Sequence, residues 1–222
     1  MNIIPILYED NDILVINKQS GLAVQGGEGI LHSLDKILSK QIGQKVYLVH
    51  RLDKDTAGIL VVAKNPKTAA IYTEIFSGKK AVKEYISFCV GFPPKENGVI
   101  DSVIEQKGAE KAALTNYQIE AKSAVKIEDE SVNLCCMRWR IETGRMHQIR
   151  IHATKLGVPI VADDKHGNFK MNKFLRKNLD AKKLMLVASK LTIPVNSAKN
   201  IKTFEISLPE HMQQFAEKSE LL

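Results

Sequence analysis

The sequence predicts an α+β fold whose sheet is largely antiparallel or mixed. Strand-like segments dominate the chain, helical segments are interspersed among them, and the regular strand-helix rhythm of a parallel sheet is missing. A mixed chain of 222 residues often forms one unit around one core. We therefore expect a single domain that spans residues 1–222.

The first third of the chain alternates strand-like and helical segments. A run that is apolar at every residue predicts an interior strand at 59–63, because both faces of such a strand are covered. Gly43 ends one helical pattern, and Asn65 followed by Pro66 supplies the N-cap and first residue of the next helix. The elements expected here are a strand at 13–16, a helix at 31–42, a short apolar piece at 46–49, a strand at 59–63 and a helix at 66–77.

The rest of the chain is expected to be mainly strand. Apolar side chains alternate along 84–90, so Tyr85 faces away from the more apolar side of that strand. In the helical pattern that follows residue 146, Ile149 and Ala153 belong to the core stripe, whereas Arg150 lies in a polar sector. The elements expected here are strands at 84–90, 117–119, 132–141, 191–193 and 204–206 and a helix at 147–156.

The charge balance favours a polyanionic partner without identifying it. The chain has 32 Lys and Arg against 25 Asp and Glu, a formal net charge of +7. Residues 165–190 hold eight basic side chains and a single acid, Asp180, so the surplus of this run equals that of the whole chain. The run is either the solvated face of a helix or a surface that follows phosphates.

Cysteine and histidine spacings do not indicate a metal centre. Cys89, Cys135 and Cys136 are odd in number and match neither a zinc nor a thioredoxin spacing, which suits a reducing compartment. His147 and His152 are five residues apart rather than the four of a zinc-binding helical pair. The N-terminus shows no signal pattern, and no window is apolar enough to span a membrane. We expect a cytoplasmic protein without a metal.

The polar segment 50–58, His-Arg-Leu-Asp-Lys-Asp-Thr-Ala-Gly, lies between two apolar strands. Loops that are held by core at both ends often carry functional groups. Asp53, with Arg51 close by, can stay ionised and oriented, as a nucleophile or base must at neutral pH. The alternative is a charged connection that folds back on itself through local ion pairs.

Three further segments carry candidate groups. Arg145 and Arg150 lie near the opening of the helix expected after residue 143, where they could bind phosphate or pair with a carboxylate; an ordinary amphipathic helix is the alternative. Tyr85 is, by spacing alone, a packing residue. Residues 26–29, Gly-Gly-Glu-Gly, form a flexible turn rather than a P-loop, because the Gly-Lys-Ser/Thr ending is missing.

Two of these motifs, taken together, resemble the signatures of the RluA family of RNA pseudouridine synthases. The first is 50–58 with its Leu-Val-Val-Ala-Lys continuation, and the second is Thr-Gly-Arg-Met-His-Gln-Ile-Arg-Ile-His at 143–152. The resemblance covers about residues 6–208. Further markers of it are Lys83, Tyr85, Gly91, Ala113, Thr115, Tyr117, Gly157, Pro159, Ile160 and the stretch 163–167.

The resemblance implies a pseudouridine synthase fold, with a large, mostly antiparallel mixed sheet, flanking helices and a central active-site cleft. It implies that Asp53 is the essential aspartate, that Tyr85 stacks near the target base and accepts a proton, and that Arg150 pairs with the aspartate. Arg51 matches the arginine thought to fill the gap left by a flipped base. The residues expected to contact RNA are His50, Arg51, Arg145, His147, Lys165, Lys182 and Lys183.

The same resemblance sets expectations about partners. Isomerisation of uridine consumes no water, redox equivalent or metal, so no cofactor is expected. The substrate is expected to be structured RNA, either rRNA or tRNA, acted on by a monomer. Many relatives carry an N-terminal S4 RNA-binding domain, but here the catalytic pattern begins almost at Met1. That domain is therefore expected to be missing, so the catalytic domain and its basic run would recognise the RNA.

Several positions depart from the family pattern. Ala57 stands where serine is usual, Ala162 where glycine is usual, His166 where tyrosine is usual, and Val187 where histidine is common. None of these removes a proposed catalytic group. Together they suggest a divergent member with an unusual RNA target.

Two other functions remain open. Asp53 and Asp55 could be the two carboxylates of a glycoside or nucleoside hydrolase, which would liberate free uracil or sugar. A catalytically silent RNA-binding relative with the same fold is the other alternative.

Overall fold

The computed structural model describes residues 3–27, 32–106, 108–127, 129–195 and 200–221. The chain forms two compact units. The first contains Met1–Lys83 and Ala188–Ser207, and the second contains Glu84–Val187 and Leu208–Leu222. Each unit is built from two separate stretches of chain. Whether they behave as the expected single domain stays a prediction.

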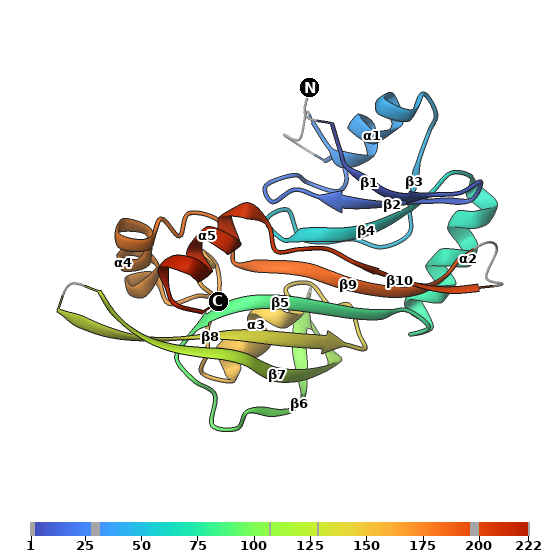
Figure 1. Cartoon of the computed structure of the whole chain (residues 1–222). Helices are drawn as coiled ribbons and strands as arrows, with labels where there is room; N and C mark the ends of the chain where they lie inside the picture. The colour runs from blue at the N-terminus through green and yellow to red at the C-terminus, as the bar shows by residue number, and fades with distance from the viewer. Residues whose placement is uncertain (1–2, 28–31, 107, 128, 196–199, 222) are drawn as a thin grey trace. The chain divides into compact units, whose positions relative to one another are not determined.

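The first unit is a sheet with two helices. Its strands follow the order β1-β2-β4-β9, with β3 beside β4 and β10 beside β9 (Figure 1). The pairs β1–β2, β2–β4, β3–β4 and β9–β10 are all antiparallel. Its elements are β1 (Ile6–Glu9), β2 (Ile13–Lys18), α1 (Leu34–Ile42), β3 (Tyr47–Leu48), β4 (Ala57–Ala63), α2 (Pro66–Ser77), β9 (Leu186–Val195) and β10 (Asn200–Glu205).

The core of the first unit lies between this sheet and α2. β4 is buried along its whole length, as its continuous apolar run predicts. Ile59 and Val61 of β4 pack with Ile13 of β2 and with Tyr72 and Phe76 of α2. The Tyr72 hydroxyl, buried with its ring, donates a hydrogen bond to a carbonyl oxygen of β9 at 2.8 Å. The polar loop 50–56 therefore leads directly into a strand, β4, that the core holds in place.

The second unit contains the strand order β5-β8-β7-β6 (Figure 1). β6, β7 and β8 form an antiparallel meander. Trp139 of β8 is fully buried, and its indole N–H donates to the Ser87 hydroxyl of β5 at 2.7 Å. Phe215 packs against Phe88, with ring centroids 5.6 Å apart. The elements are β5 (Val82–Val90), β6 (Asn97–Gln106), β7 (Ala109–Ile127), β8 (Glu130–Ile141), α3 (Gln148–Lys155), α4 (Phe169–Leu179) and α5 (Glu210–Lys218).

The α+β class with a large, mostly antiparallel sheet and flanking helices is confirmed. The predicted caps also hold. The Asn65 side chain accepts the N–H of Thr68 at 2.9 Å, and Gly43 ends α1 with a φ of 72°.

Four elements of the structure were not predicted from the sequence: β1, β6, α4 and α5. Leu31 and the end of the 26–29 turn lie outside the described residues. The central cleft stays a prediction. Within the described part of the chain, no helix is both long and apolar enough to cross a membrane.

Candidate active site

The loop that carries Asp53 joins β3 to β4 in the first unit. Asp53 is half-buried, and its carbonyl oxygen accepts the N–H of Thr56 at 3.2 Å, which closes a turn just before β4. Leu52 is 6% exposed and Thr56 is 3% exposed, so the loop is anchored on both sides of the aspartate. Arg51 is exposed. The backbone around Asp53 is therefore fixed, and the side chain of Arg51, two residues earlier, is accessible to solvent.

Lys18, the last residue of β2, fixes this loop through a buried ammonium group. Its Nζ donates to the carbonyl oxygens of Lys54 at 2.8 Å, Leu22 at 2.9 Å and Gln19 at 3.0 Å. Three acceptors match the three N–H groups of an ammonium. Because Lys54 follows Asp53 directly, the place of the aspartate depends on this buried lysine, a role that the sequence did not suggest.

The electrostatics of Lys18 differ from those of a surface lysine. Burial lowers the pKa of Lys18 to about 8, although the charges of Asp55 and Asp53 act in the opposite direction. The Ser20 hydroxyl donates a further hydrogen bond to the carbonyl oxygen of Asp55 at 2.7 Å, which ties the segment after β2 to the loop. The loop is thus supported by a buried charged group, Lys18, and by a neutral hydroxyl at the surface, that of Ser20.

His50 fixes the start of the loop. Its Nε2 accepts the N–H of Val61 at 2.9 Å, and its ring stacks on Phe76 with centroids 3.9 Å apart. Burial, with a smaller contribution from the charge of Lys83, lowers the pKa of His50 to about 3. The imidazole is therefore neutral at physiological pH and acts as a structural support. A contact of His50 with RNA stays a prediction.

Gly58 allows β4 and β9 to approach closely. Its φ is +117°, and a Cβ at this position would lie 2.3 Å from the carbonyl oxygen of Ala188. No side chain fits in that space. The close packing of β4 against β9 therefore explains why the 50–58 motif ends in glycine.

Tyr85 lies on β5 in the second unit and is 8% exposed. Ser87 and Cys89 follow on the same side of the strand by alternation. The hydroxyl of Ser87 is 3.1 Å from the Cys89 sulfur, so this face of β5 carries polar groups. That arrangement agrees with the expectation that Tyr85 points away from the more apolar side.

The segment before α3 is tied to β7 by one amide side chain. The Gln148 Oε1 accepts from the Thr143 hydroxyl at 2.7 Å and from the Arg145 N–H at 3.0 Å. The Gln148 Nε2 donates to the Leu114 carbonyl oxygen at 3.0 Å and to the Thr115 hydroxyl at 2.9 Å. Gln148 was not singled out from the sequence, because its partners on β7 lie more than thirty residues away.

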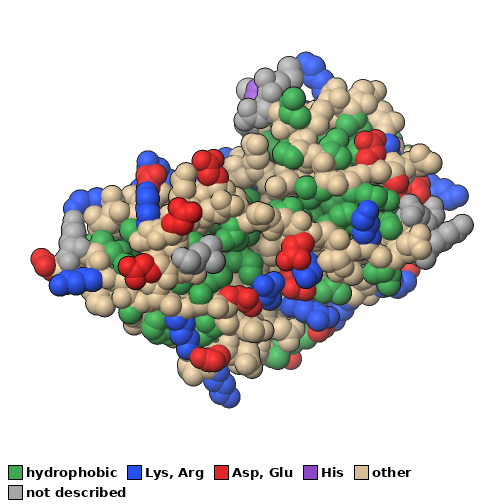
Figure 2. Space-filling view, in the orientation of Figure 1, with side chains coloured by type: hydrophobic (Ala, Val, Ile, Leu, Met, Phe, Trp, Pro, Cys, Tyr) green, Lys and Arg blue, Asp and Glu red, His purple; other side chains and the backbone are tan. Residues whose placement is uncertain are grey.

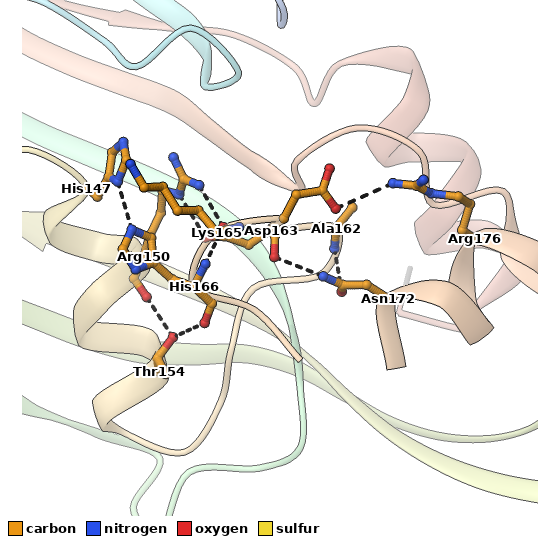
Figure 3. A network of polar contacts seen from close by, with 10 residues as sticks. His147, Arg150, Thr154, Ala162, Asp163, Lys165, His166, Asn172 and Arg176 are labelled. Carbon is orange, nitrogen blue, oxygen red and sulfur yellow. Dashed lines mark hydrogen bonds and ion pairs between the residues drawn. The ribbon is translucent and has the colours of Figure 1, made fainter. Parts of the chain in front are cut away.

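Arg150 of α3 forms a bidentate ion pair with Asp163 (Figure 3). Nε donates to Oδ2 at 2.8 Å and Nη2 donates to Oδ1 at 2.6 Å, and the two side chains are 7% and 1% exposed. The polar sector predicted for Arg150 is a buried network rather than a solvated face, because the ion pair lets the charged group be buried. Pairing of Arg150 with Asp53, which belongs to the first unit, stays a prediction.

Asp163 is ionised although it is buried. Burial raises the pKa of Asp163, but hydrogen bonds from Arg150 and from the backbone N–H groups of His166 and Lys165 outweigh that effect and hold the pKa below its ordinary value. Both backbone bonds are 2.9 Å long and reach Oδ1. The carboxylate thus organises the loop that contains it as well as the arginine.

Asn172 of α4 secures the loop on its other side (Figure 3). Its Oδ1 accepts the N–H of Ala162 at 2.9 Å, and its Nδ2 donates to the carbonyl oxygen of Asp163 at 3.0 Å. A Cβ at Gly167 would lie 2.4 Å from the same carbonyl oxygen. Ala162, where the family usually has glycine, has a φ of 57°, a conformation that costs an alanine more than a glycine.

His147 and His166 form a hydrogen-bonded pair beside this network (Figure 3). Nδ1 of His147 is 2.7 Å from Nε2 of His166, so one ring must donate while the other accepts. The carbonyl oxygen of His166 accepts from the Thr154 hydroxyl at 2.6 Å. His166, a departure from the family pattern, is therefore built into the network, while an RNA contact of His147 stays a prediction.

The other residues expected to contact RNA have varied surroundings. The Arg145 Nε donates to the Ala112 carbonyl oxygen at 3.1 Å. Lys182 forms an ion pair with Asp180 at 2.5 Å, with both side chains more than half exposed. Lys165 and Lys183 are exposed. On the face drawn in Figure 2, Lys and Arg side chains are interleaved with Asp and Glu and form no single basic field.

Metal binding finds no support among the side chains that the structure describes. Within that part of the chain, no group of three or more His, Cys, Asp or Glu is placed to hold a metal ion. Cys89, Cys135 and Cys136 are buried free thiols. The polar groups of the two units can bind and orient a substrate and can move protons.

Comparison with known proteins identifies the family. Residues 12–155 match the family model of RNA pseudouridylate synthase. "Ribosomal large subunit pseudouridine synthase C" of Rickettsia felis is 39% identical over 170 residues, which cover 73% of this chain and 56% of that relative. "tRNA pseudouridine synthase C" of Vibrio parahaemolyticus is 32% identical over 204 residues, covering 84% and 82%. The chain thus spans little more than half the length of the ribosomal relative.

The fold gives an independent comparison. The solved structure of "Human RNA Pseudouridylate Synthase Domain Containing 4" superposes with a TM-score of 0.77 at 25% identity, covering 98% of this chain and 94% of that one. The family model covers both the loop of Asp53 and the helix of Arg150. The chain therefore belongs to the RNA pseudouridylate synthase family, in its RluA branch.

Proposed function

We propose that this protein isomerises uridine to pseudouridine in RNA, without a cofactor and with Asp53 as the essential carboxylate. The observation that carries the proposal is the family match across residues 12–155, which includes the loop of Asp53, whose backbone is held at Lys54 by the buried Lys18. The named relatives act on ribosomal RNA and tRNA, which supports one of these two classes as the substrate. The protein is further proposed to act as a monomer in the cytoplasm.

The reaction breaks the N1–C1′ bond, turns the detached uracil and joins C5 to C1′. The proton on C5 is lost and N1 gains one, so the product has the mass of the substrate. Asp53 either attacks C1′ or assists proton removal from the sugar, and Tyr85 stacks near the base and accepts the C5 proton. Arg150 is proposed to hold Asp53 ionised. Its own orientation is fixed by the 2.6 and 2.8 Å bonds to Asp163.

The target uridine must leave its stack, which costs a few kcal/mol. We propose that Arg51, whose side chain is exposed, fills the gap left by the base. Phosphate contacts would offset the rest of that cost. The proposed contact residues are His50, Arg145, His147, Lys165, Lys182 and Lys183.

Nucleoside analysis of treated RNA separates the proposal from its alternatives. RNA that lacks prior modification is incubated with the protein, digested to nucleosides and separated by chromatography. Pseudouridine should appear at the expense of uridine without release of free base. Free uracil would indicate a hydrolase instead, and RNA binding without conversion of any rRNA or tRNA would indicate a silent relative.

A further inference from the structure

The exposed face of α4 carries an aromatic ring beside a row of cations. Phe169, the first residue of α4, is 63% exposed. Lys173 and Arg176 follow it by four and seven residues, which is the spacing of one helix face. Lys170 and Lys177 lie together to one side of that face at about 100° per residue, and all four cations are exposed. We call these five residues the α4 ridge.

The ridge sits on a firmly held helix. Leu175 and Leu179 on the opposite side are buried, and Asn172 bonds to the backbone of the Asp163 loop. At the start of the helix, the side chain of Asn168 accepts the N–H of Met171 at 3.0 Å. The first turn is therefore capped, and Phe169 is presented to solvent by an ordered helix end.

The charges around the ridge leave it positive. Arg176 reaches the exposed Asp164 at 3.5 Å, a contact too long and too solvated to neutralise it fully. The other acid at the end of the helix, Asp180, pairs with Lys182. An apolar protein surface would not match such a row of cations. Nucleotides match it, because each offers a ring that stacks on an aromatic side chain and a phosphate that attracts lysine.

We propose that the α4 ridge docks a short unpaired segment of the RNA substrate, with Phe169 stacked on a base and Lys170, Lys173 and Lys177 on phosphates. The assignment rests on the proposed function in that RNA is the substrate. From Phe169 to Lys177 the helix advances about 12 Å. That length matches about three stacked nucleotides at about 3.4 Å each.

A hollow with three lysines in its lining lies at the far end of α4. It measures about 300 Å³ and opens between the end of α4 and α5. Lys182, Lys183 and Lys218 line it, with Asp180 and Glu210 as its acids. Because Lys182 is paired with Asp180, the cations that this hollow could add to the ridge are Lys183 and Lys218.

Titration of a fluorescein-labelled oligouridylate with the full chain tests the ridge. Phe169→Ala should weaken binding about tenfold at every salt concentration, since base stacking on one aromatic side chain is worth about 5- to 150-fold. Phe169→Tyr, which keeps a stacking ring, should bind like wild type. Lys173→Gln should instead lower the slope of log affinity against log salt by about 0.7, the value for one phosphate contact on a single strand.

Matched variants on the same unit serve as controls. Phe92→Ala removes another exposed ring, 39% exposed and with Lys122 at 5.8 Å from its centroid. Lys126→Gln removes an exposed lysine from β7. Neither should change affinity or salt slope. Duplex RNA of equal length should not distinguish Phe169→Ala from wild type, because its bases are already stacked. Thermal melting confirms that each variant is folded.

The same preparations are assayed for pseudouridine formation, so that the two proposals fail separately. Equal oligouridylate affinity for wild type, Phe169→Ala and Phe92→Ala overturns the ridge, whether or not the enzyme is active. Binding that depends on Phe169 and Lys173 in a protein that forms no pseudouridine supports the ridge and refutes the proposed function. An effect of Phe169→Ala on duplex RNA as large as on oligouridylate would also refute stacking as the mode of contact.

Discussion

Replacement of Asp163 by asparagine removes the charge that pairs with Arg150 while it keeps the shape of the side chain. The carboxylate accepts four hydrogen bonds, two from the guanidinium and two from the N–H groups of Lys165 and His166. Asparagine can keep Oδ1 as an acceptor, but its amide NH2 then faces the N–H of Arg150 Nε, donor against donor. The variant is therefore left with a buried arginine that lacks its counter-charge.

The expected loss of stability follows from this geometry. One charge-assisted hydrogen bond is worth about 1.5–3 kcal/mol, and breaking a buried ion pair by removal of one partner costs about 3–5 kcal/mol in total. For a chain of 222 residues, this corresponds to a melting temperature lower by about 6–20 °C. Activity should fall as well, because an arginine without its partner is no longer held in one orientation.

Asp164→Asn is the matched control for this prediction. Asp164 is the next residue, its side chain is 74% exposed, and its contact with Arg176 is 3.5 Å long, so its loss should cost less than about 0.5 kcal/mol. Denaturant unfolding of both variants, with tritium release from uridine-labelled RNA, gives the comparison. Equal stability of the two variants would refute the assigned role of Asp163.

The pH dependence of the pair has a definite sign. Because the pKa of Asp163 is lower in the folded state than in the unfolded chain, its contribution is fully present above about pH 4 and is lost as the pH falls through the folded value. The stability difference between wild type and Asp163→Asn should therefore shrink on acidification below about pH 4. A difference that stays constant down to pH 2 would contradict the ionised pair.

Two further predictions concern the first unit. Gly58→Ala should destabilise the protein by more than about 3 kcal/mol, because the added Cβ would overlap the Ala188 carbonyl group. Gly21→Ala is the control: Gly21 has a φ of +86° but open space around it, so this variant should cost only the backbone strain. Equal melting temperatures of the two variants would disprove the overlap. Lys18→Met should leave three carbonyl groups without their donor, at about 1–3 kcal/mol each. The pKa of Lys18 is about 8 in the folded protein against an ordinary 10.5, so the unfolded chain binds more protons between pH 8 and 10.5. The stability of wild type relative to Lys18→Met should therefore rise with pH across that window. A stability difference that does not change with pH in denaturant unfolding would rule this out.

Local chemistry explains which elements could be predicted from the sequence. The buried strand β4 follows from a continuous apolar run, and the start of α2 follows from Asn65 before Pro66, because these signals act within a few residues. β6 escaped prediction because Ile104 is its one fully buried residue among those described, so its apolar pattern is weak. α4 escaped because its many lysines and arginine obscure the apolar stripe around Leu175.

The supports of the candidate site could not be predicted for a different reason. Lys18 ends an apolar strand and reads as an ordinary surface lysine until the fold brings the carbonyl of Lys54 to it. The ion pair of Arg150 with Asp163 spans thirteen residues and depends on a loop held by Asn172. The aspartate and arginine themselves were found by motif, while the groups that hold them were found only from contacts in the folded chain.

The central claim is that Asp53 is the essential carboxylate of an RNA pseudouridine synthase. Its most direct measurement is tritium release from RNA labelled at uridine C5, made with wild type, Asp53→Asn and Asp55→Asn. Asp55 lies in the same loop, two residues on and exposed, so it controls for any general effect of lost charge. Release by wild type and Asp55→Asn but not by Asp53→Asn is the predicted result. Equal release by wild type and Asp53→Asn would contradict it.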